Sequence, residues 1–390
     1  MPNSKFDQLS LTELRRRRSY KWLAFPADVL PAFVAEMDFM LAPPVEAAVA
    51  EAIAIGDTGY ACENSDLGQA LSTFVRDRFT WDVDPSDVIL IPDVMSGVTE
   101  ALRVALKPGD GVVINTPVYP PFFRHITEAG GKVVEAPLAE GVGGYELDLD
   151  VVEQAFKSGA RGYLLCNPHN PTGRVFSRAE LEQVVALAAR YGVLVFADEI
   201  HAPLVLPGAR HTSFLSLGEP AAQLGAVFIS ASKAWNIPGL KCAQLVVAGE
   251  AMRSMAQSLP EGMASRAGNL GVIASISAYR DGGPWLDELI GVIDRNRRLL
   301  SDLLTELLPE VSYVPPQGGY LAWLDCRGLG LGDDPVDFFL ERGRVALGPG
   351  RKFGAPGAGH VRITMATTDE ILRSIVDRMR AALGAHASGA

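Results

Sequence analysis

Five segments of this sequence combine residue types that could bind or activate a ligand. They lie at residues 89–98, 166–174, 197–201, 227–241 and 359–364, and each of the first four begins with an apolar run or follows one. A polar segment after a short apolar run is typical of the end of a buried strand, which is where α/β proteins bind their ligands. These segments therefore supply the candidates for a functional site.

Lys233 is the candidate nucleophile. It follows the apolar run 227–229 and two serines, Ser230 and Ser232. A lysine in a partly apolar pocket has a lowered pKa, and its neutral amine can then form an imine with a carbonyl group. For any single lysine, a surface position in a loop is the alternative interpretation.

Asp198 is the candidate buried carboxylate because it directly follows the apolar run 193–197. A carboxylate at the end of a buried strand needs a cationic partner that offsets the loss of its hydration. A metal ion is the rival partner, with Asp198, Glu199, His201 and His211 as conceivable ligands. Since their spacing matches no standard metal motif, we expect no metal at this site.

Two further segments could bind anions, and a third could hold a polar group rigidly. Ser96 and Gly97 lie near a predicted helix start, where free backbone amides favour a phosphate, although Ser96 could equally be an ordinary helix cap. Arg362 lies in an alternating strand and could grip a carboxylate through two hydrogen bonds, or form a structural ion pair. In the segment 166–174, two prolines fix the backbone around Asn167 and Asn170.

The elements that would position these residues alternate between helix and strand. Helical spacing predicts helices at 66–79, 97–106 and 177–191, the last opened by a capping box at Ser177 and Glu180. Short apolar runs predict strands at 88–91, 112–114, 162–166, 193–197 and 226–230. This α/β pattern predicts a large domain with a mostly parallel, doubly wound sheet.

A second, smaller α+β domain is predicted after the Gly and Pro residues at 282–284. A long amphipathic segment at 285–308 precedes a strand-like run at 320–324. We expect an N-terminal segment at 1–35 that packs with the small domain, a large domain at 36–280 and a small domain at 281–390.

The composition limits the possible partners. Lys and Arg number 35 against 46 Asp and Glu, which gives a net charge of −11 and disfavours a nucleic-acid partner. The four-arginine run at 15–18 is then best interpreted as a solvated helix face. The apolar runs are far shorter than the ~20 residues that cross a bilayer, and no segment resembles a signal peptide. We therefore expect no membrane partner. The 4 cysteines are scattered singly, which is typical of a reducing compartment, so we expect a cytoplasmic protein.

Together, the order of these motifs resembles that of pyridoxal-phosphate enzymes of the aspartate aminotransferase fold (fold type I, the class I/II aminotransferase superfamily). Shared features are the Asn-Pro-Thr-Gly run at 170–173, Asp198 and the Ser-x-Ser-Lys run at 230–233. The runs 35–39, 198–201, 233–240 and 320–324 resemble the MalY/PatB-type cystathionine β-lyase branch. The run 93–97 departs from the Pro-Gly-Val-Val that is usual in this branch. The resemblance extends from about residue 17 to 380.

The resemblance implies a role for each candidate residue. Lys233 would be joined to the aldehyde of pyridoxal 5'-phosphate and would then act as the catalytic base, while Arg362 would bind the α-carboxylate of the substrate. Asp198 would keep the pyridine nitrogen protonated. The other cofactor contacts would be made by Ser96, Gly97, Val98, Tyr119, Asn170, His201, Ser230, Ser232 and Lys241, and by Tyr60 of a second subunit in a homodimer with shared active sites.

The implied activity is that of a carbon–sulfur lyase. Such an enzyme cleaves an amino-acid thioether, an S-substituted cysteine such as cystathionine, to pyruvate, ammonia and a thiol. An aminotransferase uses the same lysine and the same first proton transfer, so it remains an alternative. A regulatory protein that only binds the cofactor is a further alternative, but it would not need Arg362.

Overall fold

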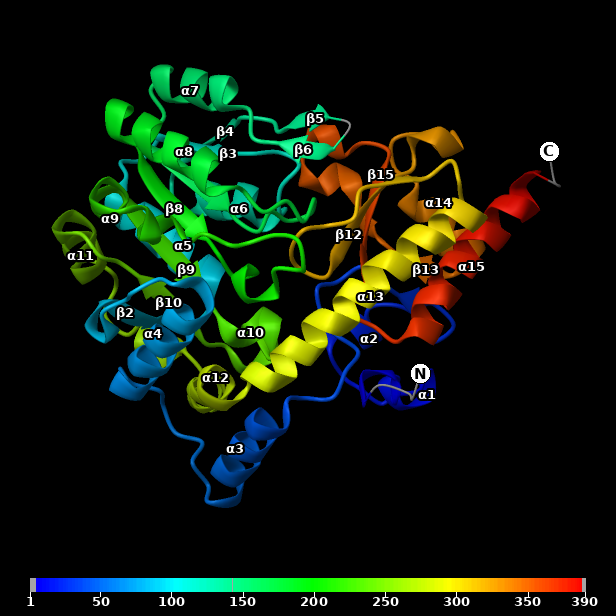
Figure 1. Cartoon of the computed structure of the whole chain (residues 1–390), viewed down its shortest axis with the longest axis horizontal. Helices are drawn as coiled ribbons and strands as arrows, with labels where there is room; N and C mark the ends of the chain where they lie inside the picture. The colour runs from blue at the N-terminus through cyan, green and yellow to red at the C-terminus, as the bar shows by residue number, and fades with distance from the viewer. Residues whose placement is uncertain (1–4, 142, 388–390) are drawn as a thin grey trace.

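The computed structural model describes residues 5–141 and 143–387. Two sheets organise the chain, one with seven strands and one with four (Figure 1). Within the described residues, no helix is long and apolar enough to cross a membrane.

The seven-stranded sheet is mostly parallel, as predicted. Its strand order is β2-β10-β9-β8-β7-β3-β4, and only β10 runs antiparallel to its neighbours. The strands are β2 (Val88–Ile91), β10 (Ala243–Val246), β9 (Gly225–Ile229), β8 (Leu194–Asp198), β7 (Gly162–Cys166), β3 (Gly111–Ile114) and β4 (Lys132–Glu135).

Both faces of this sheet are buried. In β8, Val195 and Ala197 belong to one hydrophobic cluster, whereas Phe196 belongs to another on the opposite face. Such double burial explains why the strands read as continuous apolar runs. The covering helices are α4 (Ser65–Phe79), α5 (Val94–Ala105), α6 (Pro121–Glu128), α7 (Leu149–Lys157), α8 (Arg178–Tyr191), α9 (Glu219–Leu224), α11 (Glu250–Gln257) and α12 (Asn269–Asp281). Helix α3 (Pro43–Ala54) packs against α12 instead. The doubly wound sheet is therefore confirmed.

The four-stranded sheet is antiparallel and has its own hydrophobic cluster. Its order is β11-β12-β15-β14, and α13 is the long helix that reaches it from the larger sheet (Figure 1). The elements are α13 (Gly283–Leu307), β11 (Ser312–Tyr313), β12 (Leu321–Asp325), α14 (Val336–Gly343), β14 (Gly348–Pro349), β15 (His360–Thr364) and α15 (Asp369–Ala387).

The N-terminal segment packs on the smaller sheet's cluster. Leu14 of α1 (Leu11–Leu14) and Leu30 of β1 (Leu30–Pro31) are buried there. After α2 (Tyr20–Leu23), β1 pairs in parallel with β13 (Val345–Ala346). Residues 32–39 then lead to α3 and form hydrogen bonds with segments of both halves, since the Asp38 amide donates to Ala366 and the Met37 amide to Asn236.

Candidate active site

A cavity of about 250 Å³ lies at the carboxyl ends of β7, β8 and β9, and we call it the strand-end cavity. It is closed on one side by β15 of the smaller sheet and by residues 34 and 35 of the N-terminal segment. Nine of the side chains predicted from the sequence line it. They are Tyr119, Asn170, Asp198, His201, Ser230, Ser232, Lys233, Lys241 and Arg362.

Lys233 is presented by α10 (Ala231–Ala234), a short helix that starts where β9 ends. Ser230 caps this helix, because its Oγ accepts a hydrogen bond from the Ser232 amide at 3.0 Å. The Lys233 Nζ donates to the Ala35 carbonyl at 3.1 Å. Burial, and secondly the positive charge of Arg362, lower the pKa of Lys233 to about 8. The amine is therefore neutral much more often than that of a surface lysine.

Asp198 ends β8 and is 4% exposed. Its Oδ1 accepts a hydrogen bond from the Ile200 amide at 3.0 Å. Burial raises the pKa of Asp198 to about 7, although this amide bond and the charge of Lys233 act in the opposite direction. Among the described residues, no cationic side chain forms an ion pair with it. The site thus leaves a buried carboxylate ready for a cationic ligand.

Arg362 reaches the cavity from the middle of β15. Its Nη1 donates to Asn170 Oδ1 at 3.2 Å and its Nη2 to the Phe33 carbonyl at 2.8 Å. The guanidinium lies 5.0 Å from the ring centre of Phe353, and its Nε has no hydrogen-bond partner in the described part of the chain. Burial lowers the pKa of Arg362 to about 10. A buried guanidinium without a carboxylate partner is suited to an acidic ligand.

His201 is held in its neutral form. Burial, and then the charges of Lys233 and Arg362, lower the pKa of His201 to about 3. Its Nδ1 is buried and has no hydrogen-bond partner among residues 5–141 and 143–387, and its ring packs edge-on against Tyr320 at 5.9 Å. A neutral imidazole can donate from one nitrogen and accept at the other. The unpartnered nitrogen can therefore serve a ligand.

The helix that carries the predicted anion site begins earlier than expected. Helix α5 begins at Val94, three residues before the predicted start, because Asp93 caps it by accepting the Ser96 amide at 2.9 Å. The cavity is lined by Asp93, Val94 and Met95. Of the predicted phosphate contacts, Ser96 is absent from the lining, while Gly97 and Val98 are buried in the core. The interpretation of Ser96 as the cap is wrong, since capping goes to the residue whose side chain can accept the free amides.

Lys241 and Tyr60 have contrasting positions. Lys241 lies at the cavity's rim in a left-handed backbone conformation, and its Nζ is 3.4 Å from Asp93 Oδ2. Tyr60 does not line the cavity of its own chain and is 91% exposed. Within one chain, Tyr60 therefore makes no contribution to this site.

Some residues beside the cavity carry no chemical signal in the sequence. Val34 and Ala35 form part of its wall, yet only a backbone carbonyl of this stretch contacts Lys233. A backbone carbonyl is the same in every residue type, so the sequence cannot indicate it. A buried ion pair between Lys21 and Asp38, 2.6 Å long, also lies beneath this stretch. It went unpredicted because both residue types are usually exposed.

The rival metal site is not assembled. His211 Nε2 lies 3.0 Å from Glu199 Oε2, and both side chains are 1% exposed, so these two conceivable ligands partner each other. Among the described residues, the one group with metal-like spacing is Glu140, Asp325 and His360, which lies elsewhere. Arg327 already bridges the two carboxylates of that group.

Comparisons with known proteins match most of the chain. The profile of the family "Aminotransferase class I and II" matches residues 43–379. A Mycobacterium leprae protein is 45% identical over 98% of this chain and 99% of its own length. The protein named "Cystathionine beta-lyase" from Corynebacterium glutamicum is 36% identical over 88% of this chain and 91% of its own. The crystal structure of cystalysin from Treponema denticola contains a pyridoxal 5'-phosphate cofactor; it has a TM-score of 0.90 and 29% identity, and covers 99% of this chain and 100% of that one.

Proposed function

Because the chain belongs to the class I and II aminotransferase family, we propose that it is a pyridoxal-5'-phosphate-dependent carbon–sulfur lyase of the cystathionine β-lyase type. The observation that carries the proposal is the meeting of Lys233, Asp198 and Arg362 in the strand-end cavity. A buried amine, a buried carboxylate and a buried guanidinium in one cavity are costly for a fold unless a ligand uses them.

The described residues fit this cofactor and an amino-acid substrate. Asp198 lacks a cationic partner, as a carboxylate that binds a protonated ring nitrogen should. His201 Nδ1 and Arg362 Nε are buried polar atoms without partners, so they remain available to oxygen atoms of ligands. Tyr119 lines the same cavity and is proposed to stack on the ring of the cofactor. Asn170 is proposed to donate to the ring oxygen beside His201.

When bound, pyridoxal 5'-phosphate supplies an aldehyde that condenses with amines and a protonated ring that withdraws electrons from the substrate. The part of Lys233 is twofold. Its neutral amine would hold the cofactor, and the same amine would move the proton of the substrate Cα once the substrate is bound. The lowered pKa suits both tasks at neutral pH.

Arg362 and Asn170 set the orientation of the substrate. The guanidinium of Arg362 can bind the α-carboxylate through two hydrogen bonds, and its contact with Asn170 fixes the side chain in the cavity. Lys233 and Arg362 enter from opposite halves of the molecule. Their arrangement therefore presents the Cα–H bond to the lysine amine while the carboxylate is held from the other side.

The proposed net reaction is a β-elimination. The Cα–H and Cβ–S bonds break, the sulfur leaves with the electron pair and takes up a proton, and water releases the remaining fragment as pyruvate and ammonia. With cystathionine as substrate, the thiol is homocysteine. Aminotransfer would instead consume a second keto acid and leave the Cβ–S bond intact.

One assay separates these reactions. Purified protein with bound cofactor is incubated with cystathionine, and pyruvate and free thiol are measured with and without an added keto acid. We expect equal amounts of pyruvate and thiol in both cases. Amino-group transfer that depends on the keto acid, without thiol, would identify an aminotransferase, and neither activity would identify a cofactor-binding protein.

We further propose a homodimer in which Tyr60 of each chain reaches the cofactor phosphate of its partner. Support comes from large apolar side chains that are exposed in the sequence just before this residue. Met40, Ile53 and Ile55 are 52%, 57% and 75% exposed. They lie on or next to α3, which projects from the rest of the chain in Figure 1. Such a patch is typical of an interface between subunits.

Two broader expectations also remain proposals. The division into two domains is supported by the separate hydrophobic cluster of the smaller sheet, although Trp285 and Ile293 of α13 still belong to a cluster of the larger sheet, so the boundary at 280 is proposed from the sequence alone. A cytoplasmic location is supported by four unpaired cysteines, of which Cys166, Cys242 and Cys326 are buried.

A further inference from the structure

The backbone of residues 33–39, which we call the strap, touches both charged groups on which the proposed function depends. The Phe33 carbonyl accepts a hydrogen bond from Arg362 Nη2 at 2.8 Å. Two residues later, the Ala35 carbonyl accepts from Lys233 Nζ at 3.1 Å and from Tyr320 Oη at 3.0 Å. The position of the strap therefore bears on the position of both side chains.

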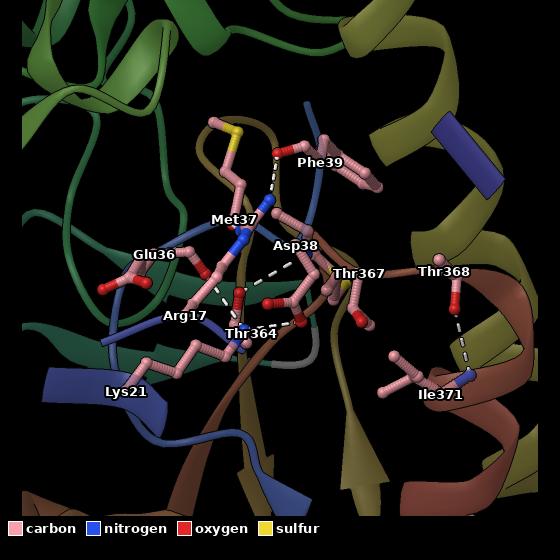
Figure 2. Close-up of polar contacts among 12 residues, drawn as sticks. Arg17, Lys21, Glu36, Met37, Asp38, Phe39, Thr364, Thr367, Thr368 and Ile371 are labelled. Carbon is pink, nitrogen blue, oxygen red and sulfur yellow. Dashed lines mark hydrogen bonds and ion pairs between the residues drawn. The ribbon is translucent and has the colours of Figure 1, made fainter. Parts of the chain in front are cut away.

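Two cationic side chains from the N-terminal segment hold the strap (Figure 2). Lys21 Nζ lies 2.6 Å from Asp38 Oδ2 and also donates to the Glu36 carbonyl at 3.2 Å. Arg17 donates to the carbonyls on either side of Asp38, with distances of 2.9 Å to Met37 and 2.6 Å to Phe39. Four consecutive strap residues are thus fixed by side chains that come from 15 to 22 positions earlier.

The strap is also tied to both halves of the molecule. The Asp38 amide donates to the Ala366 carbonyl, just beyond β15, at 2.9 Å. On the other side, Asn236 accepts from the Met37 amide at 2.9 Å and donates to the Met37 carbonyl at 3.0 Å. Asn236 follows Lys233 by three residues. These bonds link the strap to the segments that carry Arg362 and Lys233.

The ion pair is unusual in its burial. The side chains of Lys21 and Asp38 are 0% and 1% exposed, and no described residue forms a hydrogen bond with Asp38 Oδ1. A buried ion pair contributes little net stability, because loss of hydration offsets the attraction between the charges. Its directional contacts can nevertheless fix one arrangement of the backbone. Apolar side chains at these two positions would exclude water equally well, but they would not determine where the strap carbonyls lie.

We propose that Lys21 and Asp38 are positioning residues, which hold the strap so that its carbonyls orient Lys233 and Arg362 for the reaction. This inference rests on the proposed function of those two residues. Neither Lys21 nor Asp38 lines the strand-end cavity. They act by positioning the Phe33 and Ala35 carbonyls, which contact Arg362 and Lys233. A change in the pair should therefore alter both substrate binding and turnover.

Three variants of the full-length holoenzyme test the inference. Lys21→Met removes the cation and leaves Asp38 without a partner. The double variant Lys21→Met/Asp38→Leu replaces the pair by apolar side chains of similar volume, a change that buried pairs tolerate with little loss of stability. Asp28→Asn is the matched control, since it breaks the exposed Asp28–Arg344 pair of the same N-terminal segment.

Kinetics with cystathionine and hydrogen exchange of the strap amides are the two measurements. We expect kcat to fall about 10- to 100-fold and KM to rise about fivefold in the double variant. Its strap amides should exchange about tenfold faster, in the apoprotein as well as in the holoenzyme. The control should change kcat and KM by less than about twofold. A protein that had merely lost folded molecules would show a lower kcat at an unchanged KM.

The outcomes separate this inference from the proposed function. A folded double variant with parental kinetics and parental exchange of the strap would overturn the positioning role. If Lys21→Met does not fold, the double variant still decides the question. If the parent protein releases no pyruvate or thiol, the proposed function fails, whereas faster strap exchange in the double variant would still support the part of the inference that concerns the strap.

Discussion

At the scale of single residues, the environment of Lys233 makes its amine reactive near neutral pH. Its pKa of about 8 predicts that the amine is mostly protonated below pH 8 and mostly neutral above it. The rate at which apoprotein takes up pyridoxal 5'-phosphate should therefore rise through an inflection near pH 8 and then level off. Absorbance after rapid mixing measures this rate. The Asp198→Asn variant should shift the inflection to lower pH, because the carboxylate raises the pKa of Lys233. An inflection near the 10.5 of an ordinary lysine would contradict the burial argument.

Asp93 lines the cavity although the sequence did not single it out as a site residue. Its carboxylate caps α5 and lies beside Lys241, at the helix start where the sequence predicts a phosphate. An asparagine can cap the helix equally well without the negative charge. Asp93→Asn should therefore tighten cofactor binding about two- to fivefold, as measured by fluorescence titration of the apoprotein. Asp84→Asn is the matched control, because Asp84 caps an exposed turn through the Ser86 amide. Weaker binding by Asp93→Asn would place the phosphate elsewhere.

At the scale of elements, the capping box of α8 shows how a local signal supports the site. The predicted capping box is confirmed. The side chain of Ser177 accepts a hydrogen bond from the Glu180 amide, and the side chain of Glu180 accepts one from the Ser177 amide. Glu180 also pairs with Arg174 at 3.0 Å, which ties the helix to the loop that carries Asn170. Ser177→Ala should lower the free energy of unfolding by about 1 kcal/mol and leave turnover nearly unchanged. Urea unfolding measures the free energy of unfolding, and Ser258→Ala at the C-terminus of α11 is the control. A loss no greater than in the control would mean that the cap contributes nothing.

Elements with a local signal could be predicted, and those that depend on distant pairing could not. The apolar runs at 88–91, 162–166 and 226–230 indicated strands because both faces of each strand are covered. β10 was not predicted. It lies between β2 and β9 and is antiparallel to both, and its pairing with β2 joins segments that are far apart in the sequence. In the site, residue types with distinctive chemistry, such as Lys233 and Arg362, could be identified. Backbone carbonyls and the Lys21–Asp38 pair could not, because their roles arise only from the folded chain.

At the scale of the whole molecule, Tyr60 requires a second chain if it contributes to catalysis. It is the most exposed of the large hydrophobic side chains among the described residues and lies outside its own cavity. Tyr60→Phe and Lys233→Ala proteins, each inactive alone, should regain activity when mixed under conditions of subunit exchange. In a mixed dimer, one of the two sites carries neither change, so an equal mixture should reach about a quarter of the parental activity. A fully active monomer would contradict the shared site.

The most direct test of a lysine-based site in the strand-end cavity is the identity of the residue that holds the cofactor. The holoenzyme is reduced with borohydride, digested, and analysed by mass spectrometry for the peptide that carries the reduced cofactor. We predict that the added mass lies on Lys233 and that the Lys233→Ala protein carries none. Modification of Lys241 at the cavity's rim instead, or of no residue in the native holoenzyme, would contradict the assignment of this cavity as the active site.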